Sequence, residues 1–481
     1  MANLKSLAKE TVIYGLSSIV GRFLNYLLVP LYTHVISAEG GGYGIVTNLY
    51  AYVALLLVLL TFGMETTFFR FANKEGEDPD RVFSTSMAVI FLLTGLFLLA
   101  IFLFISPISC TLGYDDHPEY ILVMASVVAL DALQAIPFAY LRYRSRAVKF
   151  AALKLLFILL NIGFNLIYFV WLGGRDVLLI FLLNLVCTAL ITLFFIPDLM
   201  HIRWAMDRKL LQRMLSYSWP ILVLGIAGIL NQAADKMIFP LIYPDKARGV
   251  VELGIYGACV KVAMIMAMIT QAFRYAYEPF VFAQSRDKDK NLTYAIGMKY
   301  FLIFTLLAFL SVMAYLPLLR HLVGSDYWEG LRVIPIVMAA EIMMGIYFNL
   351  SFWYKLIDRT IYGAWFSLAG CTVLLVVNII FIPRYSYMAC AWGGFAGYAT
   401  AMVLSYVVGQ RKNPIGYPLK SMAAYVALTI LLFALMQLMP EHWPALLRLA
   451  LNTGLLLVFV AYMIHCDMPL NRLPVIGRYF R

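Results

Sequence analysis

The chain has 481 residues, of which 63% are hydrophobic and 13% are charged, and its mean hydropathy is +0.84. A soluble globular domain is roughly 45–50% apolar and about 25% charged, so this composition excludes a soluble protein and indicates a membrane protein. A bilayer-spanning helix needs about 20 residues, and apolar segments of that length use up the chain. No segment is left for a soluble catalytic domain.

Fourteen apolar segments follow one another along the chain when it is read with a window of about 19 residues. We expect membrane spans at 11–35, 43–69, 82–108, 118–141, 150–172, 176–196, 216–242, 252–276, 293–317, 328–353, 360–383, 387–409, 420–439 and 444–465. The first span is longer than the core of a signal peptide and contains Arg22. We therefore expect that it is not cleaved.

The net charge of +11 belongs to the connections between these spans. Lys and Arg gather in alternate connections, as at Arg142, Arg144 and Arg146, while the opposite connections hold few of them. By the positive-inside rule this asymmetry places both termini in the cytoplasm, and it removes the basic surface that a nucleic-acid partner would need. The six cysteines form no CxxC pair, so we expect them to be packing residues.

An internal repeat relates the first two spans to the seventh and eighth. An ungapped offset of 210 residues pairs Gly15 with Gly225, Pro30 with Pro240 and Gly44 with Gly254. Proline kinks a helix and glycine permits close approach of two helices, so these pairs carry structural weight. The predicted fold is an all-α polytopic protein with two parallel six-helix bundles, 1–200 and 201–410, followed by two helices and a tail in 411–481. Such parallel repeats are typical of alternating-access transporters.

Charged and amide side chains occur at membrane depth, where an ionisable group costs roughly 2.5–3.5 kcal/mol on insertion scales. The candidate binding residues in the leading spans of the two halves are Arg22, Asn25, Asn231, Lys236 and Lys261. Together they indicate a positive, hydrogen-bonding cavity that suits an anionic, hydroxyl-rich cargo. The alternative is that the cations pair with acids and join helices. The acids at this depth, which are also candidates for coupling to H⁺ or Na⁺, are Asp131, Asp235 and Glu341.

Two further charged segments stand at the predicted cytoplasmic ends of the second and eighth spans. They contain Glu65 with Arg70, and Arg274 with Glu278. The second pair has the i, i+4 spacing that favours contact on one helix face. These residues are either a cytoplasmic gate or interfacial anchors.

The first two spans also carry distinctive segments: Tyr14-Gly-Leu-Ser-Ser-Ile-Val-Gly-Arg-Phe-Leu-Asn25, Pro30-Leu-Tyr-Thr33, Gly42-Tyr-Gly-Ile45 and Glu65-Thr-Thr-Phe-Phe-Arg-Phe71. In these segments the chain resembles the polysaccharide transporter family, the O-antigen and capsule flippases of the multidrug/oligosaccharidyl-lipid/polysaccharide superfamily. The resemblance implies a fourteen-helix flippase of the bacterial inner membrane that moves undecaprenyl-diphosphate-linked oligosaccharide to the periplasmic leaflet. It also implies that basic residues such as Arg22, and less directly Lys236 and Lys261, contact the diphosphate.

The expected partners are the polyprenyl-diphosphate oligosaccharide and membrane lipids, with glycan polymerase or assembly proteins as candidates. No cofactor or metal is expected, and no GxxxxGK[ST] motif is present, so ATP is not the direct driver. Two alternatives stay open. An ion-coupled multidrug antiporter of the same fold would favour an acidic cavity. A membrane glycosyltransferase or polymerase could use Asp115-Asp116-His117 as a metal site or general base, although we expect solvated loop acids and no enzyme.

Overall fold

The structure is a computed structural model that describes most of the chain between its two ends. The described residues are 26, 28–200, 207–283, 290–356, 359, 361–440 and 442–467. Arg22 and Asn25 lie outside these ranges, as does most of the predicted first span. Within the described ranges the secondary structure is helical and contains no β-strand, so the all-α prediction is confirmed there.

The helices form two compact units. Unit 1 comprises residues 1–258 and 378–387, and unit 2 comprises 259–377 and 388–481. Unit 1 contains α2 Leu28–Val35, α3 Gly42–Thr61, α4 Met64–Ala72, α5 Pro79–Leu103, α6 Ile105–Leu112, α7 Pro118–Tyr143, α8 Ala147–Leu166, the π-helical turn η1 Ile167–Trp171, α9 Val177–Leu193, α10 Ile196–Met200 and α11 Arg208–Ile242, together with the first part of α12 Lys246–Ala283. The division into two six-helix bundles at 1–200 and 201–410 stays a prediction.

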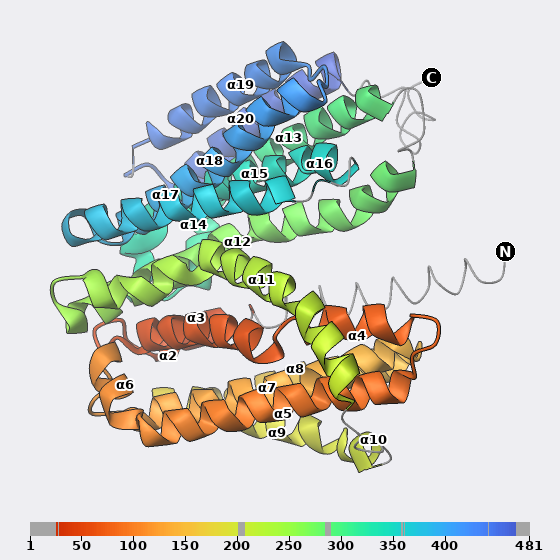
Figure 1. The fold of residues 1–481 in the computed structure, drawn as a ribbon. Helices are drawn as coiled ribbons and strands as arrows, with labels where there is room; N and C mark the ends of the chain where they lie inside the picture. The colour runs from red at the N-terminus through yellow and green to blue at the C-terminus, as the bar shows by residue number, and fades with distance from the viewer. Residues whose placement is uncertain are drawn as a thin grey trace. The chain divides into compact units, whose positions relative to one another are not determined.

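The remaining helices lie mainly in unit 2. They are α13 Lys290–Ala314, α14 Leu316–Leu319, the 3-10 helices η2 Arg320–Leu322 and η3 Ser325–Val333, α15 Ile334–Leu350, α16 Phe352–Leu356, α17 Ile361–Tyr385, α18 Tyr387–Lys412, α19 Leu419–Gln437 and α20 Ala445–Cys466. Figure 1 shows all of these elements along the coloured chain.

Twelve helical segments of the described ranges are apolar and long enough to cross a membrane. The helix α9 is also apolar but has 17 residues. These segments overlap the predicted spans in chain order, from the second to the fourteenth. The total of fourteen stays a prediction, because the first span is largely outside the described residues.

The start of α11 differs most from its predicted position. The window placed this span at 216–242, whereas the helix begins at Arg208. Asp207 caps it, because its Oδ1 accepts hydrogen bonds from the backbone N–H groups of Lys209 and Leu210. The same two bonds hold the pKa of Asp207 below its usual range. A hydropathy window passes over such a polar first turn, although a capping Asp is a readable start signal.

Close glycine contacts hold α3 against the first turns of α12 within unit 1. A Cβ atom added to Gly44 would lie 1.8 Å from the carbonyl oxygen of Val250, and one added to Gly254 would lie 2.8 Å from the backbone nitrogen of Gly44. Gly44 and Gly254 are a repeat-related pair, and they face each other. Two equivalent residues meet where the axis that relates two repeats passes, so this contact is compatible with the internal repeat, which stays a prediction.

The helix α11 also contacts α3, through the polar side chains of α3. Pro240 has no N–H group, so it leaves the carbonyl of Lys236 without its usual helical donor. Asn48 on α3 donates its Nδ2 to this carbonyl at 2.8 Å, and the Tyr52 hydroxyl donates to the next carbonyl, that of Met237, at 3.0 Å. Figure 1 shows that α11 changes direction along its length. Side chains of α3 therefore satisfy the backbone that Pro240 interrupts.

In unit 2, polar contacts tie the last two helices to α13. Asp467, which follows α20, pairs with Lys299 of α13 and accepts a hydrogen bond from the Tyr425 hydroxyl of α19 at 2.7 Å. In the first half of α20, Asn452 donates to the carbonyl of Ala314 at 3.0 Å. Helix α20 is thus bonded to α13 at two places, and α19 is joined to the Asp467 cluster.

Candidate substrate and coupling site

A carboxylate, an ammonium and a phenol meet on α11 and α12 within unit 1. Asp235 is 6% exposed. Its Oδ1 and Oδ2 lie 3.0 and 3.1 Å from Lys236 Nζ, and the Tyr256 hydroxyl donates to Oδ2 at 2.8 Å. The Lys236 ammonium also donates to the carbonyl of Gln232 at 3.1 Å. An ammonium has three donors, and three acceptors lie within reach of this one.

The alternative to an open cation was that the cations pair with acids and join helices. Lys236 does pair with an acid, Asp235, but this acid is on the same helix. The neighbouring candidate Asn231 is also buried and donates its amide to the carbonyl of Ala227, on its own helix, at 3.1 Å. Lys236 nevertheless keeps a side-chain exposure of 21%. The Lys236 ammonium therefore has hydrogen-bond partners, and its side chain is still accessible to a ligand.

A second polar cluster fills the interior of unit 1 between α3, α7 and α9. Gln134 donates its Nε2 to the carbonyl of Thr188 at 2.9 Å and to the Thr192 hydroxyl at 2.8 Å. Asn184 donates to the Tyr50 hydroxyl at 2.5 Å. These amides and hydroxyls satisfy one another, as buried polar groups must.

Asp131 stands on α7 one turn before Gln134, and it is half-buried. The cation whose charge acts on its carboxylate is Lys154 of α8. The Lys154 ammonium lies 4.0 Å from the ring centre of Phe138, also on α7, which is a cation–π contact. Asp131 is therefore a membrane-depth acid near a cation that is itself held against an aromatic ring.

Sequence reasoning missed Lys154 as a candidate. It lies inside the predicted span 150–172, where a single lysine among apolar residues is a readable signal. A second residue that the sequence did not single out is Asn378 of α17. It is fully buried, and its amide atoms have no hydrogen-bond partner among the described residues. A lone asparagine in an apolar span is a weaker signal, because most such amides bond to a neighbouring helix.

The remaining deep candidates belong to unit 2. Lys261 of α12 and Glu341 of α15 are both half-buried. The structure does not place them relative to Asp235 or Lys236, because these residues belong to the other unit. Arg22 and Asn25 lie outside the described residues, so the predicted convergence of the whole set is not tested.

The four candidate gate residues have these surroundings. Glu65 forms an ion pair with Arg142 of α7, and the Arg70 guanidinium lies 4.1 Å from the ring centre of Tyr217 on α11. In unit 2 the Arg274 guanidinium lies 4.7 Å from the ring centre of Phe348 on α15. The side chain of Glu278 lies outside the described part. Three of the four residues therefore contact partners within their own units.

The loop that motivated the enzyme alternative, which is predicted to be external, leads into a helix. His117 precedes Pro118 at the start of α7, and its Nδ1 lies 2.8 Å from Glu119 Oε1. The His117 ring stacks on Tyr120 at 4.8 Å. Asp115 and Asp116 are exposed. Among the described residues, no three His, Cys, Asp or Glu side chains gather as a metal site would require.

A family model described as "Polysaccharide biosynthesis protein" matches residues 7–279. A solved structure titled "Lipid II flippase MurJ, inward closed conformation" has a TM-score of 0.74 and 14% identity, covering 94% of this chain and 99% of that chain. An inward-facing multidrug resistance MATE family transporter of the MOP superfamily has a TM-score of 0.64 and 14% identity, covering 81% and 93%. No curated protein sequence matches the chain significantly.

A third solved structure, an outward-facing multidrug resistance MATE family transporter of the MOP superfamily, has a TM-score of 0.56 and 14% identity, covering 84% of this chain and 95% of that chain. Likeness at this identity shows the fold alone, and it is the fold of a multi-pass integral membrane transporter. The family model, in contrast, matches more than half of the 481 residues. The chain belongs to the polysaccharide biosynthesis protein family.

Proposed function

We propose that this protein is a flippase for oligosaccharide units linked to undecaprenyl diphosphate. It moves them from the cytoplasmic to the external leaflet of the bacterial inner membrane, for assembly of O-antigen, capsule or exopolysaccharide. The observation that carries this proposal is the family match over residues 7–279. The likeness of 94% of the chain to a structure named as a lipid II flippase supports it through the fold.

The diphosphate is recognised by cations at membrane depth, which are Arg22, Lys236 and Lys261, assisted by the amides of Asn25 and Asn231. At Lys236 the binding step is an exchange, because the ammonium is already bonded to Asp235 and Gln232. Phosphate oxygens that take both of the donors now bonded to Asp235 leave its carboxylate with the Tyr256 hydroxyl as its remaining donor. Charge-assisted bonds to phosphate are strong enough to compete with a carboxylate.

This exchange also supplies a route to ion coupling. A buried carboxylate that loses its cation is costly, so Asp235 is the acid proposed to bind H⁺ or Na⁺ at a stage of the cycle when Lys236 is bonded elsewhere. Asp131, with Lys154 as its neighbouring cation, and Glu341 are the other acids that can serve this role.

Alternating access requires a cytoplasmic gate, and Glu65, Arg70, Arg274 and Glu278 are the proposed gate residues. The Glu65–Arg142 pair and the stacking of Arg70 on Tyr217 describe one arrangement of the gate. Opening would exchange these partners.

The roles of Arg22 and Lys236 can be tested by removing both cations. A strain lacking the protein, complemented with Arg22→Ala plus Lys236→Ala, should show about tenfold less surface glycan or lower, since a hydrogen bond to a charged group contributes about 1.5–3 kcal/mol. The matched control, Arg175→Ala plus Lys209→Ala, removes two exposed cations and should restore the glycan. Both proteins should reach the membrane in equal amounts by immunoblot.

Wild-type surface glycan in the Arg22→Ala plus Lys236→Ala strain would contradict the binding assignment. Loss of resistance to cationic drugs with intact glycan would instead favour a multidrug antiporter.

A further inference from the structure

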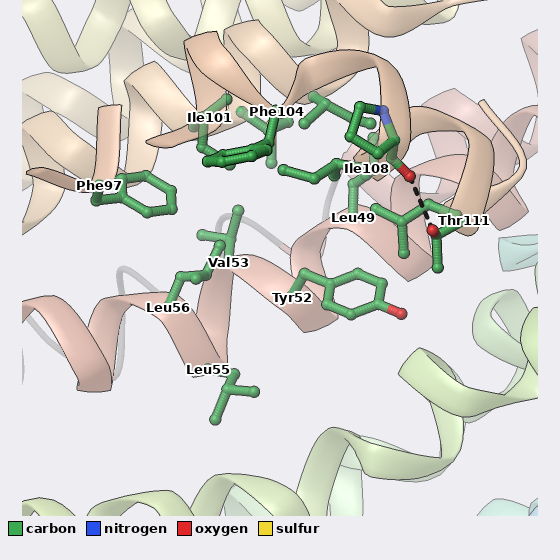
Figure 2. A pocket seen from close by; sticks show the side chains of 15 residues that line it. Leu49, Tyr52, Val53, Leu55, Leu56, Phe97, Ile101, Phe104, Ile108 and Thr111 are labelled. Atoms are coloured by element: carbon green, nitrogen blue, oxygen red, sulfur yellow. Dashed lines mark hydrogen bonds between the residues drawn. The ribbon is translucent and has the colours of Figure 1, made fainter. Parts of the chain in front are cut away.

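An apolar groove lies in unit 1, separate from the polar clusters. It has a volume of about 530 Å³ and is bounded by α3, α5, α6 and α7. Figure 2 shows Val53 and Leu56 of α3 facing Phe97 and Ile101 of α5 across it, with Leu49 beside Ile108 of α6. The hydroxyls of its wall are already bonded, since Tyr52 and Thr111 donate to the carbonyls of Met237 and Pro107. The groove therefore suits a hydrocarbon.

A cation stands beside one end of this groove. The groove includes Thr111 and Leu112, the last residues of α6. Gly113 follows with φ +79°, and a Cβ atom added there would lie 3.7 Å from Lys246 Cδ. Lys246, at the start of α12, is exposed and forms no ion pair with any described residue. It lies in a connection that the loop charges predict to be external.

We propose that this groove binds the prenyl chain of a polyprenyl phosphate or diphosphate, with the phosphate at Lys246, in the external leaflet. The inference rests on the proposed function, which delivers such a lipid to that leaflet. It does not rest on apolarity alone, because lipid tails are as apolar as the groove and gain little by entering it. Selection comes from the charge of Lys246, which favours an anionic head group.

The rings in the groove favour a prenyl chain over a saturated acyl chain. Tyr52, Phe97 and Phe104 all border it. The flat, polarisable double bonds of isoprene units pack against ring faces, which a flexible saturated chain does less well. The groove is thus proposed as a holding site for the tail as the product leaves the protein.

The experiment is native mass spectrometry of the full-length protein with equal amounts of undecaprenyl phosphate and phosphatidylglycerol. Ala125→Phe and Ile108→Trp place rings in the groove from α7 and α6, and Lys246→Glu reverses the charge. Each should lower the bound fraction of undecaprenyl phosphate by about fivefold or more, and the two groove variants should leave phosphatidylglycerol unchanged. The matched controls are Leu122→Phe, an exposed position on α7 outside the groove, and Arg175→Glu, an exposed external cation. They should bind both lipids as the wild type does.

Two results would overturn the proposal. In the first, all variants bind as much undecaprenyl phosphate as the wild type. In the second, the groove variants lose phosphatidylglycerol and keep undecaprenyl phosphate. The amount of surface glycan in a deletion strain distinguishes an error in the groove assignment from an error in the flippase assignment. If glycan is lost on deletion of the protein but the groove variants bind prenyl phosphate normally, the groove assignment alone is wrong. If the wild type binds no prenyl phosphate and deletion leaves glycan intact, the flippase assignment is wrong.

Discussion

Asp235 and Lys236 are adjacent in sequence and form the central ion pair of the candidate site. Their position inside the seventh predicted span identified both residues, because charged side chains at membrane depth are rare. Their mutual contact was one of two alternatives. Adjacent residues on a helix point about 100° apart, so only the bend of the long lysine side chain toward Asp235 decides between pairing and an open cation. Sequence periodicity does not encode that bend.

The pair predicts a specific pattern of stability. Lys236→Met or Asp235→Leu alone leaves one buried charge without its partner, which costs about 3–5 kcal/mol. The double variant removes both charges and should be more stable than either single variant. Thermal unfolding of the purified protein in detergent measures all four proteins. Tyr256→Phe serves as a milder control, since it removes one hydrogen bond to the carboxylate.

If the stability lost by the double variant equals the sum of the losses in the two single variants, Asp235 and Lys236 do not interact. The membrane-embedded charges would then have to find other partners, and the exchange mechanism proposed for the diphosphate would lose its basis.

At the scale of helices, most spans could be predicted from hydropathy. The predicted span 118–141 corresponds to Pro118–Tyr143, and 420–439 corresponds to Leu419–Gln437. The errors fall where a helix continues beyond its apolar part, as at the Asp207 cap of α11. Sequence also could not show that Asn48 would reach the carbonyl freed by Pro240, because that bond joins residues 188 positions apart.

The crossing of α3 and α12 should depend on the absence of a side chain at Gly44. Gly44→Ala would bring a methyl group within 1.8 Å of the Val250 carbonyl oxygen, so one helix must move. We expect this variant to lose most of its folded yield, as judged by size-exclusion chromatography in detergent. Gly95→Ala on α5 is the matched control, because nothing lies within 4 Å of its added Cβ.

A Gly44→Ala protein with the yield and unfolding temperature of the wild type would contradict this crossing geometry. It would also call into question the contact between Gly44 and Gly254 that is compatible with the internal repeat.

At the scale of the whole molecule, the composition already excluded a soluble protein, and the loop charges and apolar segments defined a polytopic bundle. The candidate site could be predicted in part. The candidate residues of α11 were named from their depth in a predicted span. Lys154 was missed although a lysine in an apolar span is a readable signal, while the hydrogen-bond network of Gln134 could not be predicted, because its partners come from another helix. The convergence of Arg22 and Lys261 with this cluster remains a prediction.

The direction in which a lipid-linked glycan moves can be measured as the leaflet on which complete units accumulate when the protein is removed. Spheroplasts of a deletion strain would be treated with a glycan-cleaving enzyme that cannot cross the membrane. If the protein is a flippase, the undecaprenyl-diphosphate-linked units are protected until the membrane is permeabilised, and re-expression makes them accessible. Units that are fully accessible in intact deletion spheroplasts would contradict the flippase assignment.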